Sequence, residues 1–186
     1  MKAEHQAGAA RYLTGVLAIA LLLAAAAAAA EITREEALSL AFPGATLRAE
    51  QVFMTPEQQR RAGEYGGVEV SSALVARYVA TKDGQVIGRA YVDTAIVRTK
   101  KETLLISLDT AGRVRRIDVT AFLEPAEYRA PEPWLRQYRD QVLSDDLGVQ
   151  KAIRPIAGAT LTTRAVNASV RRVLAIDQAL QAGGRQ

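Results

Sequence analysis

Cysteine is absent from the 186-residue sequence, and the single histidine, His5, stands in an N-terminal segment typical of an export leader. The absence of cysteine excludes disulfides, thiolate nucleophiles and cysteine-ligated zinc or iron–sulfur centres. The absence of histidine after the leader excludes a Ser–His–Asp triad and a histidine-ligated haem in the rest of the chain. A redox function would therefore have to come from a bound cofactor.

A strong charge of one sign is also missing. The chain has 24 Lys and Arg against 20 Asp and Glu, and without the leader's two basic residues and one acidic residue the net charge falls from +4 to +3. This small excess indicates a surface of mixed sign. Two basic groups, at 98–101 and 113–116, fall on predicted strand ends, where successive side chains point to opposite faces. We interpret them as solvated strand edges and expect no nucleic-acid partner.

Long apolar runs are confined to the N-terminus. Residues 12–30 carry no charge, follow the basic residues Lys2 and Arg11, and end in an Ala-x-Ala pattern at 28–30. These features predict either a signal peptide, residues 1–30, or an uncleaved membrane anchor helix over residues 12–30. Both alternatives predict that the remaining 156 of the 186 residues are exported, to the periplasm or another extracytoplasmic space. That length suits a single domain.

Turn and capping signals divide the rest of the chain into short elements. Asp83-Gly84 and the run from Asp109 to Gly112 predict hairpin turns between β-prone segments, and no βαβ rhythm is present. The pattern therefore predicts an α+β fold, in which a twisted antiparallel sheet is flanked by helices. The expected strands are 47–53, 73–81, 85–97, 103–108 and 113–122, and the expected helices are 33–41, 55 to the stop at Gly66, 134–143 and 163–181.

The segment that suggests chemistry is IAGATLTTRAV, residues 156–166. Its Gly-Ala pair allows a close approach to the backbone, and Thr160 adds a hydroxyl to the turn. Thr162 and Thr163 are the predicted caps of the last helix. The free N–H groups and partial positive charge of a helix N-terminus suit a phosphate. On these residues alone, a phosphate site and ordinary helix capping both stay open, since residues 44–46 repeat the GAT tripeptide without cap threonines after it.

The same segment resembles the FMN-attachment motif of the FMN-binding domain family, which includes the FMN-carrying subunits of the Na⁺-translocating NADH:quinone oxidoreductase and of the Rnf-type electron transport complex. In that motif, Asp-x-x-Ser/Thr-Gly-Ala-Thr followed by Leu-Thr-Ser, the GAT threonine carries FMN through a phosphoester made by a dedicated flavin transferase. The resemblance implies attachment at Thr160. The cofactor-binding residues in this segment would be Gly158, Ala159, Thr160, Leu161, Thr162 and Thr163.

A second stretch, residues 103–125, resembles the central hairpin of the family, with two apolar strands, a D-x-x-G turn and then an acidic residue, Glu124. In the family, the backbone at this position borders the isoalloxazine ring. The resemblance therefore adds Glu124 to the expected cofactor site. Tyr128 and Trp134, on either side of the proline-rich loop, either stack on a flavin or hold the loop in place.

The resemblance covers about residues 74–180. It divides the predicted domain, 31–186, into an N-terminal extension, 31–72, and an FMN-binding-like core, 73–186. Two positions depart from the family motif, because Arg154 replaces its aspartate and Ala157 its Ser or Thr. FMN esterified at residue 160 and FMN bound noncovalently are both compatible with these departures.

The resemblance implies an exported electron-transfer domain that relays electrons between membrane or periplasmic redox partner proteins and needs a flavin transferase for its maturation. Membrane association is compatible with the anchor alternative. A second hypothesis is a flavin-free exported module of the same fold that binds a partner or senses a signal. A stand-alone flavin reductase is less favoured, because the sequence holds no nicotinamide-binding motif.

Overall fold

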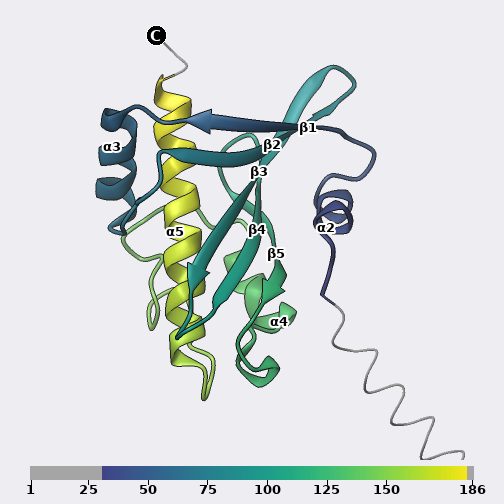
Figure 1. Cartoon of the computed structure of the whole chain (residues 1–186). Helices are drawn as coiled ribbons and strands as arrows, with labels where there is room; N and C mark the ends of the chain where they lie inside the picture. Colours follow the sequence, from purple (N-terminus) through teal and green to yellow (C-terminus); the bar gives the residue numbers. More distant parts are fainter. Residues whose placement is uncertain (1–30, 184–186) are drawn as a thin grey trace, which may run out of the picture. The chain divides into compact units, whose positions relative to one another are not determined.

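Five antiparallel strands, paired in sequence order, form a single meandering sheet (Figure 1). The structure is a computed structural model that describes residues 31–183, and the predicted leader, 1–30, lies outside them. Asp83 and Gly84 both adopt a positive φ, as the tight hairpin turn predicted at this point requires. The strands are β1 (Thr46–Phe53), β2 (Leu74–Lys82), β3 (Gln85–Ile96), β4 (Lys101–Leu108) and β5 (Val114–Phe122).

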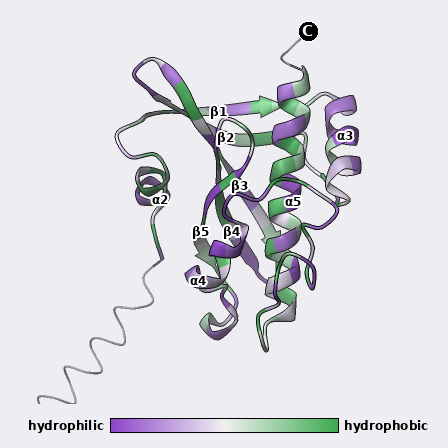
Figure 2. Cartoon of the chain, turned by 180° about the vertical axis from the view of Figure 1, so that it is seen from behind, coloured by the Kyte–Doolittle hydropathy of each residue, from purple (hydrophilic) through white to green (hydrophobic). Residues whose placement is uncertain are grey.

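Helices cover both faces of this sheet. Strand alternation directs Leu104 and Ile106 into a large core beneath α5, whereas Leu105 enters a smaller core beneath α2. Figure 2 shows that α3 is mostly hydrophilic, whereas hydrophobic and hydrophilic stretches alternate along α5. The helical elements are α2 (Arg34–Ala41), α3 (Pro56–Gly66), η2 (Ala126–Tyr128), α4 (Glu132–Leu135), η3 (Arg136–Tyr138) and α5 (Thr160–Gly183), where η denotes a 3₁₀ turn.

The predicted α+β class, with an antiparallel sheet and flanking helices, is confirmed for the described residues. The segment predicted as an N-terminal extension, 31–72, supplies the edge strand β1 and also α3, which packs against α5. The predicted signal or anchor helix lies outside the described residues. Between residues 31 and 183, no helix has both the length and the apolar character needed to cross a membrane.

The helix predicted at 134–143 is wrong in its length. α4 ends at Leu135, a single 3₁₀ turn follows, and Asp140 adopts a positive φ of 63°. The backbone then pairs with the start of β5, because the amide of Asp140 donates to the carbonyl of Val114 at 2.7 Å and the amide of Val114 donates to the carbonyl of Gln141 at 2.9 Å. Pairing with a distant strand therefore overrides the local preference for a helix.

Gly88, in β3, tests how tightly α2 packs on the sheet. A Cβ at this position would lie well inside van der Waals contact with the Leu108 carbonyl oxygen and with the Phe42 ring. We expect Gly88→Ala to lower the free energy of unfolding by about 1–3 kcal/mol in urea denaturation, because overpacking forces the backbone to move. Gly63→Ala is the matched control. Its nearest atom would be 3.6 Å away in a helix, so we expect a gain of about 0.5–1 kcal/mol. Equal stability of the Gly88→Ala protein would contradict this packing.

Candidate functional site

Three segments that are far apart in the sequence meet at one end of the domain. They are the turn between β3 and β4, the loop that follows β5, and the beginning of α5 (Figure 1). Between them lies a cavity of about 210 Å³, which we call the site hollow. Its lining residues are Val97, Arg98, Glu124, Tyr128, Gly158, Ala159, Thr160, Leu161 and Thr162.

The helix behind the hollow begins three residues earlier than the sequence predicts. The amide of Thr163 donates to the carbonyl of Ala159 at 3.0 Å, which closes the first helical turn, and α5 starts at Thr160. Gly158 precedes it with a φ of 77°, a conformation that favours glycine. The prediction that Thr162 and Thr163 are helix caps is therefore wrong, because both already lie inside the first turn.

These two threonines use their hydroxyls to hold the helix start in place. The hydroxyl of Thr162 donates to the carbonyl of Tyr128 at 2.7 Å, which ties α5 to the loop after β5. The hydroxyl of Thr163 donates to the carbonyl of Ala159 at 3.0 Å and accepts from the amide of Ile156 at 2.9 Å. Both side chains are buried, so neither hydroxyl is available to a ligand.

Thr160 differs from its neighbours because its side chain is exposed and faces the hollow. Among the described residues, no acceptor bonds to the amides of Thr160, Leu161 and Thr162. Three unpaired N–H groups at a helix N-terminus, with the partial positive charge of the helix dipole, make a favourable place for an anion. The arrangement combines an accessible hydroxyl with a phosphate-binding helix start.

Glu124 shapes the opposite wall. Its Oε1 atom accepts hydrogen bonds from the amides of Thr99 and Lys100, at 2.7 and 2.8 Å, and a longer one from the amide of Arg98, at 3.3 Å. These backbone donors stabilise the carboxylate, so the pKa of Glu124 is lowered from its ordinary value. Glu124 therefore fixes the β3–β4 turn, which brings Val97 and Arg98 to the hollow.

Most of the residues expected at the site are brought together. Six of the seven line the hollow, and the exception is Thr163, which is buried behind it. Tyr128 lines the hollow and is 40% exposed. Trp134 instead holds the loop in place, because its indole N–H donates to the carbonyl of Arg154 at 2.6 Å. The sequence did not identify Val97 and Arg98, whose position depends on strand register and on the Glu124 bonds.

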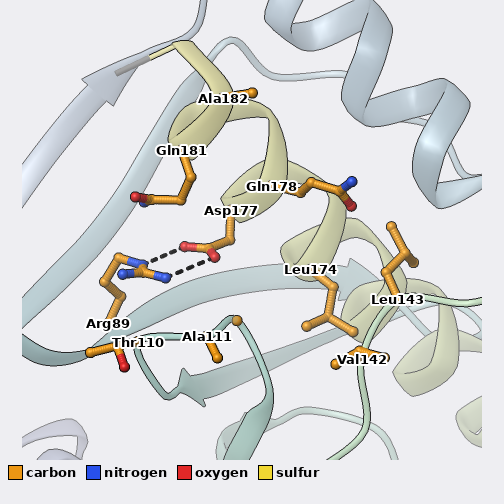
Figure 3. A pocket seen from close by; sticks show the side chains of 11 residues that line it. Arg89, Thr110, Ala111, Val142, Leu143, Leu174, Asp177, Gln178, Gln181 and Ala182 are labelled. Atoms are coloured by element: carbon orange, nitrogen blue, oxygen red, sulfur yellow. Dashed lines mark hydrogen bonds and ion pairs between the residues drawn. The ribbon is translucent and has the colours of Figure 1, made fainter. Parts of the chain in front are cut away.

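A second cavity, of about 410 Å³, lies near the other end of α5 and was not predicted. Figure 3 shows the side chains of Arg89 and Asp177, which line this cavity, in direct contact with each other. Their ion pair is 2.5 Å long and buried, and the hydroxyl of Tyr91 donates to the same carboxylate at 2.6 Å. Because Arg89 and Asp177 are 88 positions apart, no local pattern could have indicated the pair. Their mutual satisfaction supports a structural role in holding α5 to the sheet.

Glu102 is the one buried carboxyl among the described residues whose two oxygens both lack a hydrogen-bond partner. It lies opposite Ala95 of β3 and Phe122 of β5, on the face that α5 covers. Burial raises its pKa to about 7; the charge of Asp93 adds to this rise and that of Arg129 opposes it. The folded chain therefore holds a group that titrates near neutrality, although its sequence after the leader has no histidine.

A scan against protein-family models finds no match to this chain, and a search of curated proteins finds no match either. The resemblance to the FMN-binding domain family and the export of the chain therefore stay predictions. Within the described part of the chain, no group of three His, Cys, Asp or Glu side chains is placed to hold a metal ion.

The buried carboxyl predicts a pH dependence of stability. As the pH rises from 4.5 to about 7, the unfolded chain ionises Glu102 while the folded chain keeps its proton. The contribution of this group to the free energy of unfolding is therefore full below pH 4.5 and falls by about 3 kcal/mol by the time the pH exceeds the folded pKa. We expect Glu102→Gln to remove this fall, so its stability relative to the wild type should rise between pH 5 and pH 8 in urea denaturation.

Glu57→Gln is the control for this measurement. The hydrogen bonds from Arg60 and Arg61 lower the pKa of the exposed Glu57 to about 2, so its contribution is lost only as the pH falls below 4.5. The control should therefore keep the wild-type slope between pH 5 and pH 8. The same slope in Glu102→Gln would show that Glu102 is not protonated in the folded chain.

Proposed function

We propose that this protein is an exported electron-transfer domain that carries FMN, esterified through its phosphate to Thr160. The observation that carries the proposal is the exposed hydroxyl of Thr160 beside three unpaired helix amides, in the same hollow as Glu124 and Tyr128. The two stretches that resemble the FMN-binding domain family supply Thr160 with its helix amides and Glu124, whereas Tyr128 comes from the loop between the stretches. Their meeting at one cavity is what the proposed site requires.

The hollow fits one part of FMN better than the whole. The unpaired amides of residues 160–162 suit a phosphate, and the exposed guanidinium of Arg98, on the opposite wall, adds positive charge. The cavity of about 210 Å³ is smaller than the roughly 300–1,000 Å³ of pockets that enclose a whole ligand. Tyr128 and Leu161, which line the hollow and are partly exposed, would contact the part of a flavin that the cavity does not enclose, and a partner protein could exchange electrons there.

The chain's own residues position the cofactor and do no chemistry on a substrate. FMN supplies the electron transfer when it is bound. Gly158 and Ala159 would let the backbone approach the phosphate, while Thr162 and Glu124 hold the helix start and the facing turn in place. With a flavin dinucleotide as the donor, the Thr160 oxygen would bond to the flavin-side phosphorus and lose its proton. The P–O bond of the pyrophosphate would break, and the nucleoside monophosphate would leave.

The departures at Arg154 and Ala157 do not remove a residue that lines the hollow. Both side chains are exposed, and neither belongs to the cavity lining. Arg154 contributes to the described contacts through its backbone, whose carbonyl accepts from Trp134 and whose amide donates to Gln137. The departures therefore bear on recognition by the transferase. If the transferase does not recognise this chain, the proposal becomes noncovalent binding of FMN in the same hollow.

Thr160→Val is the decisive variant, because it removes the hydroxyl and keeps the shape. We expect the wild-type chain, co-expressed with a flavin transferase and then denatured, to show flavin fluorescence on a gel and an FMN-sized mass increment. We expect Thr160→Val to lose both. Thr46→Val is the matched control. Thr46 also ends a GAT tripeptide and is also exposed, but it lies on β1 and does not line the hollow. It should keep the full flavin content.

Flavin that survives denaturation in Thr160→Val would contradict the ester at this residue. Flavin that co-purifies with the wild type and is released on denaturation would support the noncovalent form. If no flavin accompanies the wild-type chain under either condition, the electron-transfer proposal fails. The hypothesis of a flavin-free exported module that binds a partner would then take its place.

A further inference from the structure

Large hydrophobic side chains are exposed around the mouth of the site hollow. Leu161 and Tyr128, which line it, are 46% and 40% exposed. Ile96 and Leu123, at the ends of β3 and β5, are 65% and 56% exposed. Lys101 lies between these two, because it pairs with Ile96 and its carbonyl accepts from the amide of Leu123 at 3.0 Å. Exposed apolar residues gathered at one place indicate an interaction surface.

The same end of the domain also carries basic side chains that have no charged partner among the described residues. Nine arginines of the described residues form ion pairs elsewhere, including the buried pair of α5. Five exposed basic side chains on the segments that form or adjoin the hollow form neither an ion pair nor a side-chain hydrogen bond within residues 31–183, and Lys82 and Arg139, which lie elsewhere, also form no ion pair there. The five are Arg98, Lys100, Lys101, Arg154 and Arg164.

The nearby carboxylates offset only part of this charge. The carboxylate of Glu124 stays ionised, held by the amides of the 98–100 turn, whereas Glu102 is buried. Glu127 is the exposed acidic residue of η2. Arg164 lies one helical turn after Thr160, on the same side of α5. Positive charge therefore exceeds negative charge around the hollow, with Arg98 on the β3–β4 turn that lines it and Arg164 on the helix behind it.

We propose that this surface binds the acidic face of a redox partner protein, which covers the hollow while electrons pass. We call the surface the docking rim. It consists of Ile96, Leu123, Tyr128 and Leu161 together with Arg98, Lys100, Lys101, Arg154 and Arg164. The redox role of the partner rests on the proposed function, whereas its acidic character rests on the rim itself.

The shape of the rim favours a protein over a membrane. Arg98 lines the concave opening, and Arg164 follows Thr160 of the opposite wall by one helical turn, so a protruding acidic segment can contact both. A flat anionic bilayer would meet the outer edge and leave the hollow uncovered. Apolar side chains at the centre and charges around them are the arrangement of a protein interface. Charge complementarity of this kind steers the encounter and makes it sensitive to salt.

The test uses the full chain, expressed with its leader, purified after export and carrying Thr160→Val so that no flavin ester forms. An acidic flavodoxin is the probe, and binding is followed through the ¹⁵N amide signals. We expect shifts in 96–101, 123–128 and 160–164, and an affinity that falls about tenfold or more between about 50 mM and about 300 mM salt. We expect Lys100→Glu/Lys101→Glu to weaken binding roughly tenfold.

Lys82→Glu/Arg139→Glu is the matched control. It reverses two cations that also lack ion pairs within the described residues but lie outside the rim and do not line the hollow. Its affinity should stay within about twofold of the parent protein. Signals that shift elsewhere, equal binding of a basic cytochrome c, or equal losses in the two double variants would overturn the proposal.

Phosphatidylglycerol vesicles provide the competing ligand. Co-sedimentation that the Lys100→Glu/Lys101→Glu change abolishes, with no binding of flavodoxin, would assign the rim to a membrane and overturn the protein partner. Because the binding assay needs no flavin, its result stays decisive even if the wild-type chain carries none. Failure of the proposed function and failure of the docking rim are therefore separate outcomes.

Discussion

The packing of α5 against the sheet determines the position of the helix wall of the candidate site. Half of its 24 residues are buried, which places its apolar stripe across the larger core. Polar contacts secure it along its length, through Thr162 at its start, Arg171 in its middle and Asp177 near its end. A shift by one helical turn, about 5.4 Å, would break all three and move Thr160 away from the hollow.

The different roles of Thr160, Thr162 and Thr163 follow from this packing of α5. The buried hydroxyls of Thr162 and Thr163 satisfy backbone groups that would otherwise be buried without partners. Thr160 is then the residue whose hydroxyl reaches the cavity. The hydrogen bonds of Thr162 and Thr163 hold the helix start in place. The amides of residues 160–162 have no acceptor among the described residues, so they can bind an anion. A covalently held cofactor needs both a fixed attachment point and free binding groups.

Three carboxylates show how environment assigns different roles to the same chemical group. Glu124 is held by backbone amides and builds a turn, so its pKa is lowered. Asp177 is buried with Arg89 and Tyr91 and fastens a helix. Glu102 is buried without a hydrogen-bond partner, and its pKa is raised to about 7. Their positions in the sequence do not distinguish them, since burial and hydrogen-bond partners decide which form of the group is stable.

The sequence by itself determined the fold class, the hairpins and the segments of the site, because turn residues, caps and strand alternation are local signals. Asp83-Gly84 predicted its hairpin, whereas the family resemblance pointed to the GAT segment and Glu124, which line two walls of the hollow. Tertiary structure decided the rest. Pairing with Val114 ended the helix predicted at 134–143, and contacts with Tyr128 and Ile156 moved the start of α5 to Thr160. Such contacts join residues that no local pattern relates, so packing alone decides which hydroxyl and which amides stay free.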